Sequence, residues 1–145
     1  MADGLSPEER ELRALLGEAR TIAVVGLSSK AHRPSHEVAA YLQRHGYRIV
    51  PVNPNETEVL GEPAYASLLD IPADLRVDVV DVFRRAEETP EVARQAAAIG
   101  AKVLWLQEGI VSAEAAAIAS GAGMDVIMGV CIKVVYRRVM GAQSA

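Results

Sequence analysis

Short apolar runs recur along the chain at nearly regular intervals. They cover residues 21–25, 47–52, 77–82, 102–106 and 125–128. Their starts lie 23 to 30 residues apart, which leaves room for one helix in each gap. Several runs are apolar throughout instead of alternating with polar residues, as is typical of strands covered on both faces. The pattern therefore predicts five parallel strands joined by helices.

Helix start and stop signals lie between the predicted strands. Ser6-Pro7-Glu8-Glu9 is a capping box, in which Ser6 caps a helix and Glu9 follows three residues later. This predicts a helix within residues 1–19. Further helices are expected to begin at Pro34, Thr89 and Ser112, and to end near His45, Gly100 and Gly121 or Gly123 respectively.

These elements predict a single α/β domain, a doubly wound parallel sheet of five strands with helices on both faces, because crossovers between parallel strands are right-handed. The domain is expected to span residues 1–145, with its core in about residues 20–139. Residues 53–72 are rich in turn formers and predict irregular structure with a short helical turn near 67–70, whereas residues 131–139 match no clear pattern. In such sheets, ligands bind at the carboxyl ends of the strands, where the strand order reverses.

Composition narrows the classes of partner. Of the 145 residues, 50% are hydrophobic and 23% are charged, which predicts a folded core. A net charge of −4 and an aromatic content of 4% argue against nucleic acid as a partner. The longest segment without a charged residue has ten residues, 115–124, and is too short to cross a membrane.

The N-terminus and the cysteine count predict the compartment. Residues 1–4 carry no basic residue and precede no apolar segment, so no signal peptide is expected. A single cysteine, Cys131, excludes an internal disulfide and favours the reducing cytosol.

We expect no catalytic group and no metal site. His32 and His36 have the spacing of metal ligands on a helix, but Pro34 lies between them and places His32 outside the predicted helix. Asp78 and Asp81 fall in the third predicted strand and point to opposite faces, so they cannot act as a pair. Cys131 follows the last strand, where it is either a reactive thiol or, more commonly, a small buried apolar residue.

The segment after the first strand is a candidate anion site. Residues 26–34 read Gly-Leu-Ser-Ser-Lys-Ala-His-Arg-Pro and lead into a predicted helix. Backbone N–H groups at a helix N-terminus attract anions, Ser28 and Ser29 offer hydroxyls, and Lys30 and Arg33 add positive charge. The alternative is an ordinary loop with solvated basic side chains.

Two nucleotide-binding motifs are incomplete. The dinucleotide fingerprint needs three glycines and an acidic residue after the second strand, whereas this chain has only Gly26 and carries Asn53 at the second position. The P-loop motif lacks its Gly-Lys-Ser/Thr. NAD and ATP are therefore disfavoured, although Asn53 and Arg84 suit NADP better than NAD.

Polar residues also follow the third and fourth strands. Residues 83–85 are Phe-Arg-Arg, and an arginine fork matches the oxygens of a phosphate. Alternatively, both arginines are solvated and balanced by Glu87 and Glu88. Residues 107–109 are Gln-Glu-Gly, which offer an amide and a close backbone approach, or else a simple tight turn.

Taken together, residues 26–37, 52–54, 82–84 and 105–110 resemble the motifs of the CoA-binding domain family. This family includes the Rossmann-like domain of the alpha subunit of succinyl-CoA synthetase and small stand-alone bacterial proteins. The resemblance covers roughly residues 21–138. It implies a Rossmann-like fold that binds coenzyme A (CoA) or an acyl-CoA through its strand-end loops. The implied contacts are Gly26, Leu27, Ser28, Ser29, Lys30, Ala31, Arg33, Asn53, Pro54, Asn55, Phe83, Arg84, Arg85, Gln107, Glu108 and Gly109.

The chain departs from the synthetase pattern in two places that concern charge. Its first loop has fewer glycines, and the lysine after the second strand has no equivalent at Asn55 or Glu56. We expect Arg84 or Arg85 to supply the missing positive charge for the 3′-phosphate of CoA.

The resemblance leaves the role of the protein open between several alternatives. The chain carries no second domain with the phosphorylated histidine of the synthetase, which favours a non-catalytic, accessory or sensor protein. The alternatives are a CoA-handling component of an acyl-CoA synthetase-type enzyme that needs a partner, and an NAD(P)-binding module. Apolar residues near the C-terminus are expected either to cover a sheet edge or to contact a second copy or a protein partner. These residues are Ile132, Val134 and Val135.

Overall fold

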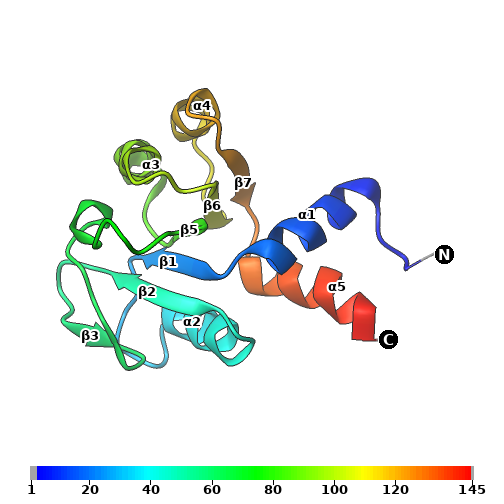
Figure 1. Cartoon of the computed structure of the whole chain (residues 1–145), viewed down its shortest axis with the longest axis horizontal. Coiled ribbons are helices and arrows are strands. Elements are labelled where there is room, and N and C mark those ends of the chain that lie inside the picture. Colours follow the sequence, from blue (N-terminus) through cyan, green and yellow to red (C-terminus); the bar gives the residue numbers. More distant parts are fainter. Residues whose placement is uncertain (1–2, 145) are drawn as a thin grey trace.

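A parallel sheet with helices on both faces forms the centre of the computed structural model, which describes residues 3–144 (Figure 1). The main elements are α1 (Pro7–Glu18), β1 (Thr21–Val25), α2 (Pro34–Arg44), β2 (Arg48–Val52), β5 (Val79–Val82), α3 (Thr89–Ala98), β6 (Val103–Glu108), α4 (Ala113–Gly121), β7 (Asp125–Gly129) and α5 (Ile132–Ser144). Between β2 and β5 lie β3 (Glu58–Val59), β4 (Glu62–Pro63) and the 3-10 turn η1 (Leu68–Asp70), and a second 3-10 turn, η2 (Ala86–Glu88), precedes α3. Residues 1, 2 and 145 of the predicted domain lie outside the described residues.

The strand order is β2-β1-β5-β6-β7, and all four pairings are parallel. The chain leaves β1 for β2 on one side and then crosses to β5 on the other side. The order therefore reverses between β1 and β5, and their carboxyl ends flank the crevice where ligands bind in such sheets. This confirms the predicted doubly wound α/β fold.

Each face of the sheet has its own apolar core. Ile22 and Val24 of β1 point into a core shared with α1, α2 and α5, whereas Ala23 and Val25 point into a core shared with α3 and α4. β1 is buried along its whole length, because it lies between two strands and under helices on both faces. Trp105 of β6 is fully buried in the first core, and its indole N–H donates to the Val130 carbonyl at 2.9 Å.

The helices α1 to α4 begin at the residues that the capping signals predict. The Ser6 hydroxyl accepts from the Glu9 N–H at 3.1 Å, and the Glu9 carboxylate accepts from the Ser6 N–H at 2.9 Å, which completes the capping box. α2 and α3 begin at Pro34 and Thr89, and the Ser112 hydroxyl caps α4. No helix among the described residues is long and apolar enough to span a membrane.

The structure corrects two details of the sequence analysis. Asp78 lies just before β5, not within it, and its carboxylate accepts from the N–H groups of Arg20 and Thr21 at 2.8 and 3.0 Å. In the segment 131–139, which matched no pattern, Cys131 precedes the helix α5 and residues 132–139 belong to it; α5 packs against α1. The irregular segment after β2 contains the predicted helical turn, η1, and in addition the two-stranded β3–β4 hairpin.

Candidate functional site

Three strands end together around Gly26. The Gly26 N–H donates to the Val52 carbonyl of β2 at 2.8 Å, and the Phe83 N–H after β5 donates to the Val25 carbonyl at 2.9 Å. Gly26 has a φ of +89°, and a Cβ built on it would lie 2.4 Å from the Phe83 carbonyl oxygen. Only glycine fits this close approach, so the turn out of β1 is fixed directly beside the ends of β2 and β5.

The β1–α2 loop leads into a helix N-terminus that no side chain caps. The N-cap residue of α2 is Arg33, which makes no side-chain capping hydrogen bond, and Pro34 follows it. Within the loop, the Ser28 N–H donates to the Ser35 hydroxyl at 3.1 Å, and the Lys30 N–H donates to the Ser28 hydroxyl at 3.0 Å. These bonds order the loop beside the positive end of α2, which attracts anions.

The segment after β2 holds the β1–α2 loop through two side chains. The Asn53 amide donates to the Leu27 carbonyl at 3.0 Å, and its oxygen accepts from the Asn55 N–H at 2.9 Å. The Glu56 carboxylate accepts from the Ser29 N–H at 2.8 Å. This bond, assisted by the charge of Lys30, lowers the pKa of Glu56. A carboxylate of the chain itself therefore already occupies one N–H of the candidate anion site.

The two arginines after β5 are not equivalent. Arg85 is 78% exposed, and its guanidinium donates to Glu88 at 3.0 Å. Arg84 is 34% exposed, lies 3.7 Å from Glu88, and lines a cavity. Both arginines therefore pair with Glu88, as in the alternative reading of residues 83–85. Only Arg84 also lines the cavity.

The cavity beside Arg84 has a volume of about 320 Å³ and lies at the carboxyl ends of β1 and β2. Val25, Val52 and Leu68 form its apolar wall, and Glu88 and Glu91 bring negative charge to its α3 side. A volume of this size is at the lower end of the range for small-molecule sites. The contribution of η1 and α3 to this wall depends on how distant segments pack, so no local sequence pattern indicates it.

The loop after β6 has a structural role, because it is bonded to the start of α5. Gln107 is buried, and its side-chain oxygen accepts from the Ile132 N–H at 3.1 Å, at the start of α5. Glu108 is exposed, and Gly109 has a φ of +80° with no atom within 4 Å of a built Cβ. Since β6 is one strand further from the crevice than β5, ligand contacts at residues 107–109 stay a prediction.

The groups with potential reactivity lie apart from one another. Cys131 is a free, half-buried thiol that packs against the core. His45 stacks on Tyr41 and has its Nδ1 2.8 Å from the Tyr41 carbonyl, at the end of α2. Within residues 3–144, no three His, Cys, Asp or Glu side chains gather as a metal site would require.

Comparison with known proteins agrees with this arrangement. The sequence model of the CoA binding domain family matches residues 20–137. The chain is 43% identical over 131 residues to an uncharacterized Bacillus subtilis protein, YneT, covering 90% of this chain and 96% of that protein. A solved structure of a hypothetical protein from Pyrococcus horikoshii superimposes with a TM-score of 0.88 at 39% identity, covering 96% of this chain and 95% of the other.

One relative has a named activity and is far longer. The chain is 34% identical over 85 residues to an ADP-forming acetate–CoA ligase of Archaeoglobus fulgidus. The match covers 57% of this chain but only 12% of the ligase. The chain therefore corresponds to one part of that enzyme.

Proposed function

The chain belongs to the CoA-binding domain family, and from this membership we propose that it binds CoA or an acyl-CoA at the carboxyl ends of β1, β2 and β5. The observation that carries the proposal is that the uncapped α2 N-terminus and Lys30 follow β1 while Arg84 follows β5, the two strands between which the order reverses. These groups carry positive charge or the positive end of a helix dipole, which suits a ligand that is rich in phosphate.

Each part of the site suits a different part of the ligand. The N-terminal end of α2, which Lys30 and Arg33 precede in the sequence, suits the diphosphate, because a helix N-terminus stabilises negative charge. Arg84 suits the 3′-phosphate, since a guanidinium binds phosphate oxygens in pairs. The apolar wall formed by Val25, Val52 and Leu68 suits an uncharged portion of the same ligand.

We propose that the chain binds the ligand and does not itself catalyse a reaction, either as an accessory protein or as a sensor. The matched part of the acetate–CoA ligase is 12% of its length, which leaves most of that enzyme for the chemistry. The same match favours a second candidate, a CoA-handling component that works with a separate catalytic partner. The single cysteine, Cys131, supports the reducing cytosol as the place of action.

A thermal-shift series tests the proposed ligand. At a hundred times its Kd, CoA is expected to stabilise the protein by about 2.7 kcal/mol, which corresponds to a rise in Tm of about 5–10 °C for a chain of this size. Acetyl-CoA is expected to act similarly, and NAD to have no effect. A rise with NADP alone, or with none of these ligands, contradicts the proposal.

Arg84→Ala and Arg85→Ala form a matched pair for the same series. Arg84→Ala is expected to reduce the shift with CoA but not the shift with dephospho-CoA, because only CoA carries the 3′-phosphate. Arg85→Ala removes the same charge from a more exposed position and is expected to change neither shift. Equal losses for the two ligands in Arg84→Ala would assign Arg84 a role other than reading this phosphate.

Glu56→Gln is expected to tighten CoA binding by about fivefold, the effect of one charge at contact distance in a solvated site. The carboxylate of Glu56 takes up the Ser29 N–H and opposes a phosphate there, whereas glutamine keeps an oxygen for that N–H without the charge. Isothermal titration calorimetry measures the change. Glu58→Gln, which removes an exposed charge from β3, is the matched control and is expected to leave the affinity unchanged. Unchanged or weaker binding by Glu56→Gln would show that the ligand does not approach Ser29.

A further inference from the structure

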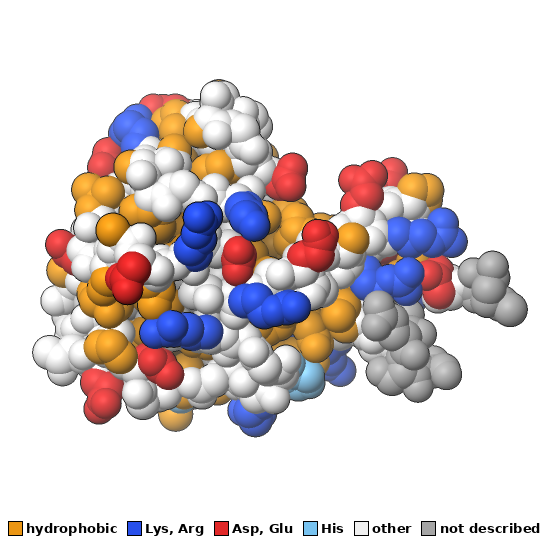
Figure 2. All heavy atoms as spheres, in the orientation of Figure 1, with side chains coloured by type: hydrophobic (Ala, Val, Ile, Leu, Met, Phe, Trp, Pro, Cys, Tyr) orange, Lys and Arg blue, Asp and Glu red, His pale blue; other side chains and the backbone are white. Residues whose placement is uncertain are grey.

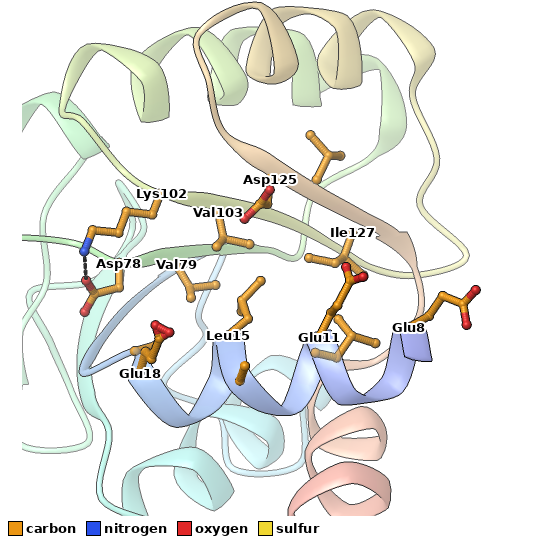
Figure 3. Close-up of a pocket in the computed structure, with 14 residues that line it drawn as sticks. Glu8, Glu11, Leu15, Glu18, Asp78, Val79, Lys102, Val103, Asp125 and Ile127 are labelled. Atoms are coloured by element: carbon orange, nitrogen blue, oxygen red, sulfur yellow. Dashed lines mark ion pairs between the residues drawn. The ribbon is translucent and has the colours of Figure 1, made fainter. Parts of the chain in front are cut away.

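A groove of about 640 Å³ lies between α1 and the starts of β6 and β7 (Figure 3). It is at the amino ends of the strands, so the length of the sheet separates it from the proposed CoA site. Leu15 of α1 points toward Val79 and Val103, and Ile127 of β7 continues the apolar floor beside Glu11. In the space-filling view, hydrophobic side chains lie in the hollow between the body of the molecule and the projecting helices, with acidic side chains next to them (Figure 2).

The strand that borders this groove is unusually uncovered. β1 and β5 are buried at every residue, and β6 is buried at five of its six residues, whereas none of the five residues of β7 is buried. β7 is the last strand of the sheet, and α4 packs against it from one face. On the other face, α1 packs mainly against α5, and Ile127 is only partly buried at the edge of the first core. An apolar strand face of this kind is normally covered by a helix.

The rim of the groove carries an excess of negative charge. Glu8, Glu11 and Glu18 stand along α1, and Asp125 begins β7. None of these four carboxylates forms an ion pair with another described residue. The remaining acidic residue at the rim, Asp78, is already bonded to two backbone N–H groups and lies 3.8 Å from Lys102. The groove therefore combines an apolar floor with four uncompensated charges.

We propose that this groove binds an amphipathic helix of a protein partner, with apolar side chains on the floor and Lys or Arg side chains along the rim. The groove-facing residues of α1 run from Glu8 to Glu18, roughly 15 Å along the helix axis, which is about three helical turns. An apolar stripe at i, i+3 or i+4 and i+7 of the partner covers that length.

The rim charges argue against the other occupants. A second copy docked through the same groove would bring the two sets of unpaired carboxylates together, in a chain whose net charge is already −4. A second CoA molecule would bring phosphates against them. A basic amphipathic helix replaces both repulsions with attraction and supplies the missing cover for β7.

The test uses a synthetic fourteen-residue helical peptide with leucines at i, i+3, i+7 and i+10 and lysines on both flanks. Fluorescence anisotropy at about 0.15 M salt, where the Debye length is about 8 Å, follows its binding to the full chain. The triple variant Glu8→Gln, Glu11→Gln, Glu18→Gln is expected to bind at least tenfold more weakly than the wild type. The triple variant Glu58→Gln, Glu62→Gln, Glu114→Gln removes as many charges elsewhere and is expected to bind as the wild type does.

Three results would overturn the proposal. The first is equal binding by the wild type and the α1 triple variant. The second is equal binding of a peptide with the same composition in scrambled order, which would reduce the interaction to general charge attraction. The third is a wild-type dimer in sedimentation analysis that excludes the peptide and dissociates on Ile127→Glu, which would assign the groove to a second copy. Circular dichroism melting of each variant confirms that the chain is folded under the assay conditions.

Discussion

Gly26→Ala is expected to lower the free energy of unfolding by about 2–5 kcal/mol, which combines the cost of a left-handed residue with the cost of overpacking. The added Cβ would lie 2.4 Å from the Phe83 carbonyl oxygen, at a φ of +89°. That oxygen belongs to the backbone directly after β5, which is buried and paired with β1 and β6, so it cannot move aside without disturbing the sheet. Urea unfolding measures the loss.

Gly109→Ala is the matched control for this loss. Gly109 has a φ of +80°, close to that of Gly26, but no atom lies within 4 Å of a Cβ built there. Its replacement is expected to cost only the left-handed strain, about 1–2 kcal/mol. If the two variants were equally destabilised, the contact with Phe83 would have no energetic consequence.

The geometry of Gly26 also changes how the ligand site can be tested. Gly26 is among the CoA contacts that the family resemblance implies, but the fold itself requires a glycine at this position. A bulkier residue at this position would therefore lower the stability of the fold, and a loss of CoA binding could not be assigned to the ligand site. Glu56 and Arg84 are better test positions, because their side chains reach the site without holding the strands together.

Local sequence signals predicted most of the fold because the strands and helices are marked by nearby residues. The five apolar runs became the five strands, and the helices begin at the predicted capping residues. The helix α5 was not predicted, because the residue that caps it is distant in the sequence. The N–H of Ile132, at the start of α5, donates to the side chain of Gln107 on β6, 25 residues earlier. A cap supplied from a distant strand leaves no mark in the residues next to the helix.

The candidate site was predictable only in outline. The rule that ligands bind at the carboxyl ends of parallel strands located the loops. The difference between Arg84 and Arg85, and the bond from Ser29 to Glu56, depend on side-chain directions that adjacent sequence positions do not reveal. Asp81 was recognised as a strand residue, but the sequence did not indicate that both of its carboxylate oxygens would be buried without a partner.

Asp81 is the one described residue whose burial conflicts with its charge. It lies in β5 between Val24 of β1 and Trp105 of β6, on the face covered by α2 and α5, and it is fully buried. Neither of its carboxylate oxygens has a hydrogen-bond partner, and the nearby indole N–H of Trp105 donates to Val130 instead. Burial raises the pKa of Asp81 well above its ordinary value of 3.8, because the charged form loses its hydration.

Asp81→Asn is therefore expected to make the protein more stable than the wild type at neutral pH. A raised pKa means that the folded state holds a proton that the unfolded state has released. The wild type then loses stability as the pH rises from 3.8 toward the folded pKa, by about 1.4 kcal/mol for each pH unit in that interval. Asparagine has the same shape without the ionisation, so the advantage of the variant is expected to be near zero at pH 3.5 and to grow with pH.

Urea unfolding at several pH values between 3.5 and 7.5 measures this difference, with Asp125→Asn as the control at an exposed position. The control is expected to follow the wild type across the whole series. A difference between Asp81→Asn and the wild type that did not change with pH would mean that Asp81 titrates alike in the folded and unfolded chains. Its carboxylate would then have to be stabilised by water or by movement of the β5–β6 region, and the core at Trp105 would be less tightly closed than its full burial indicates.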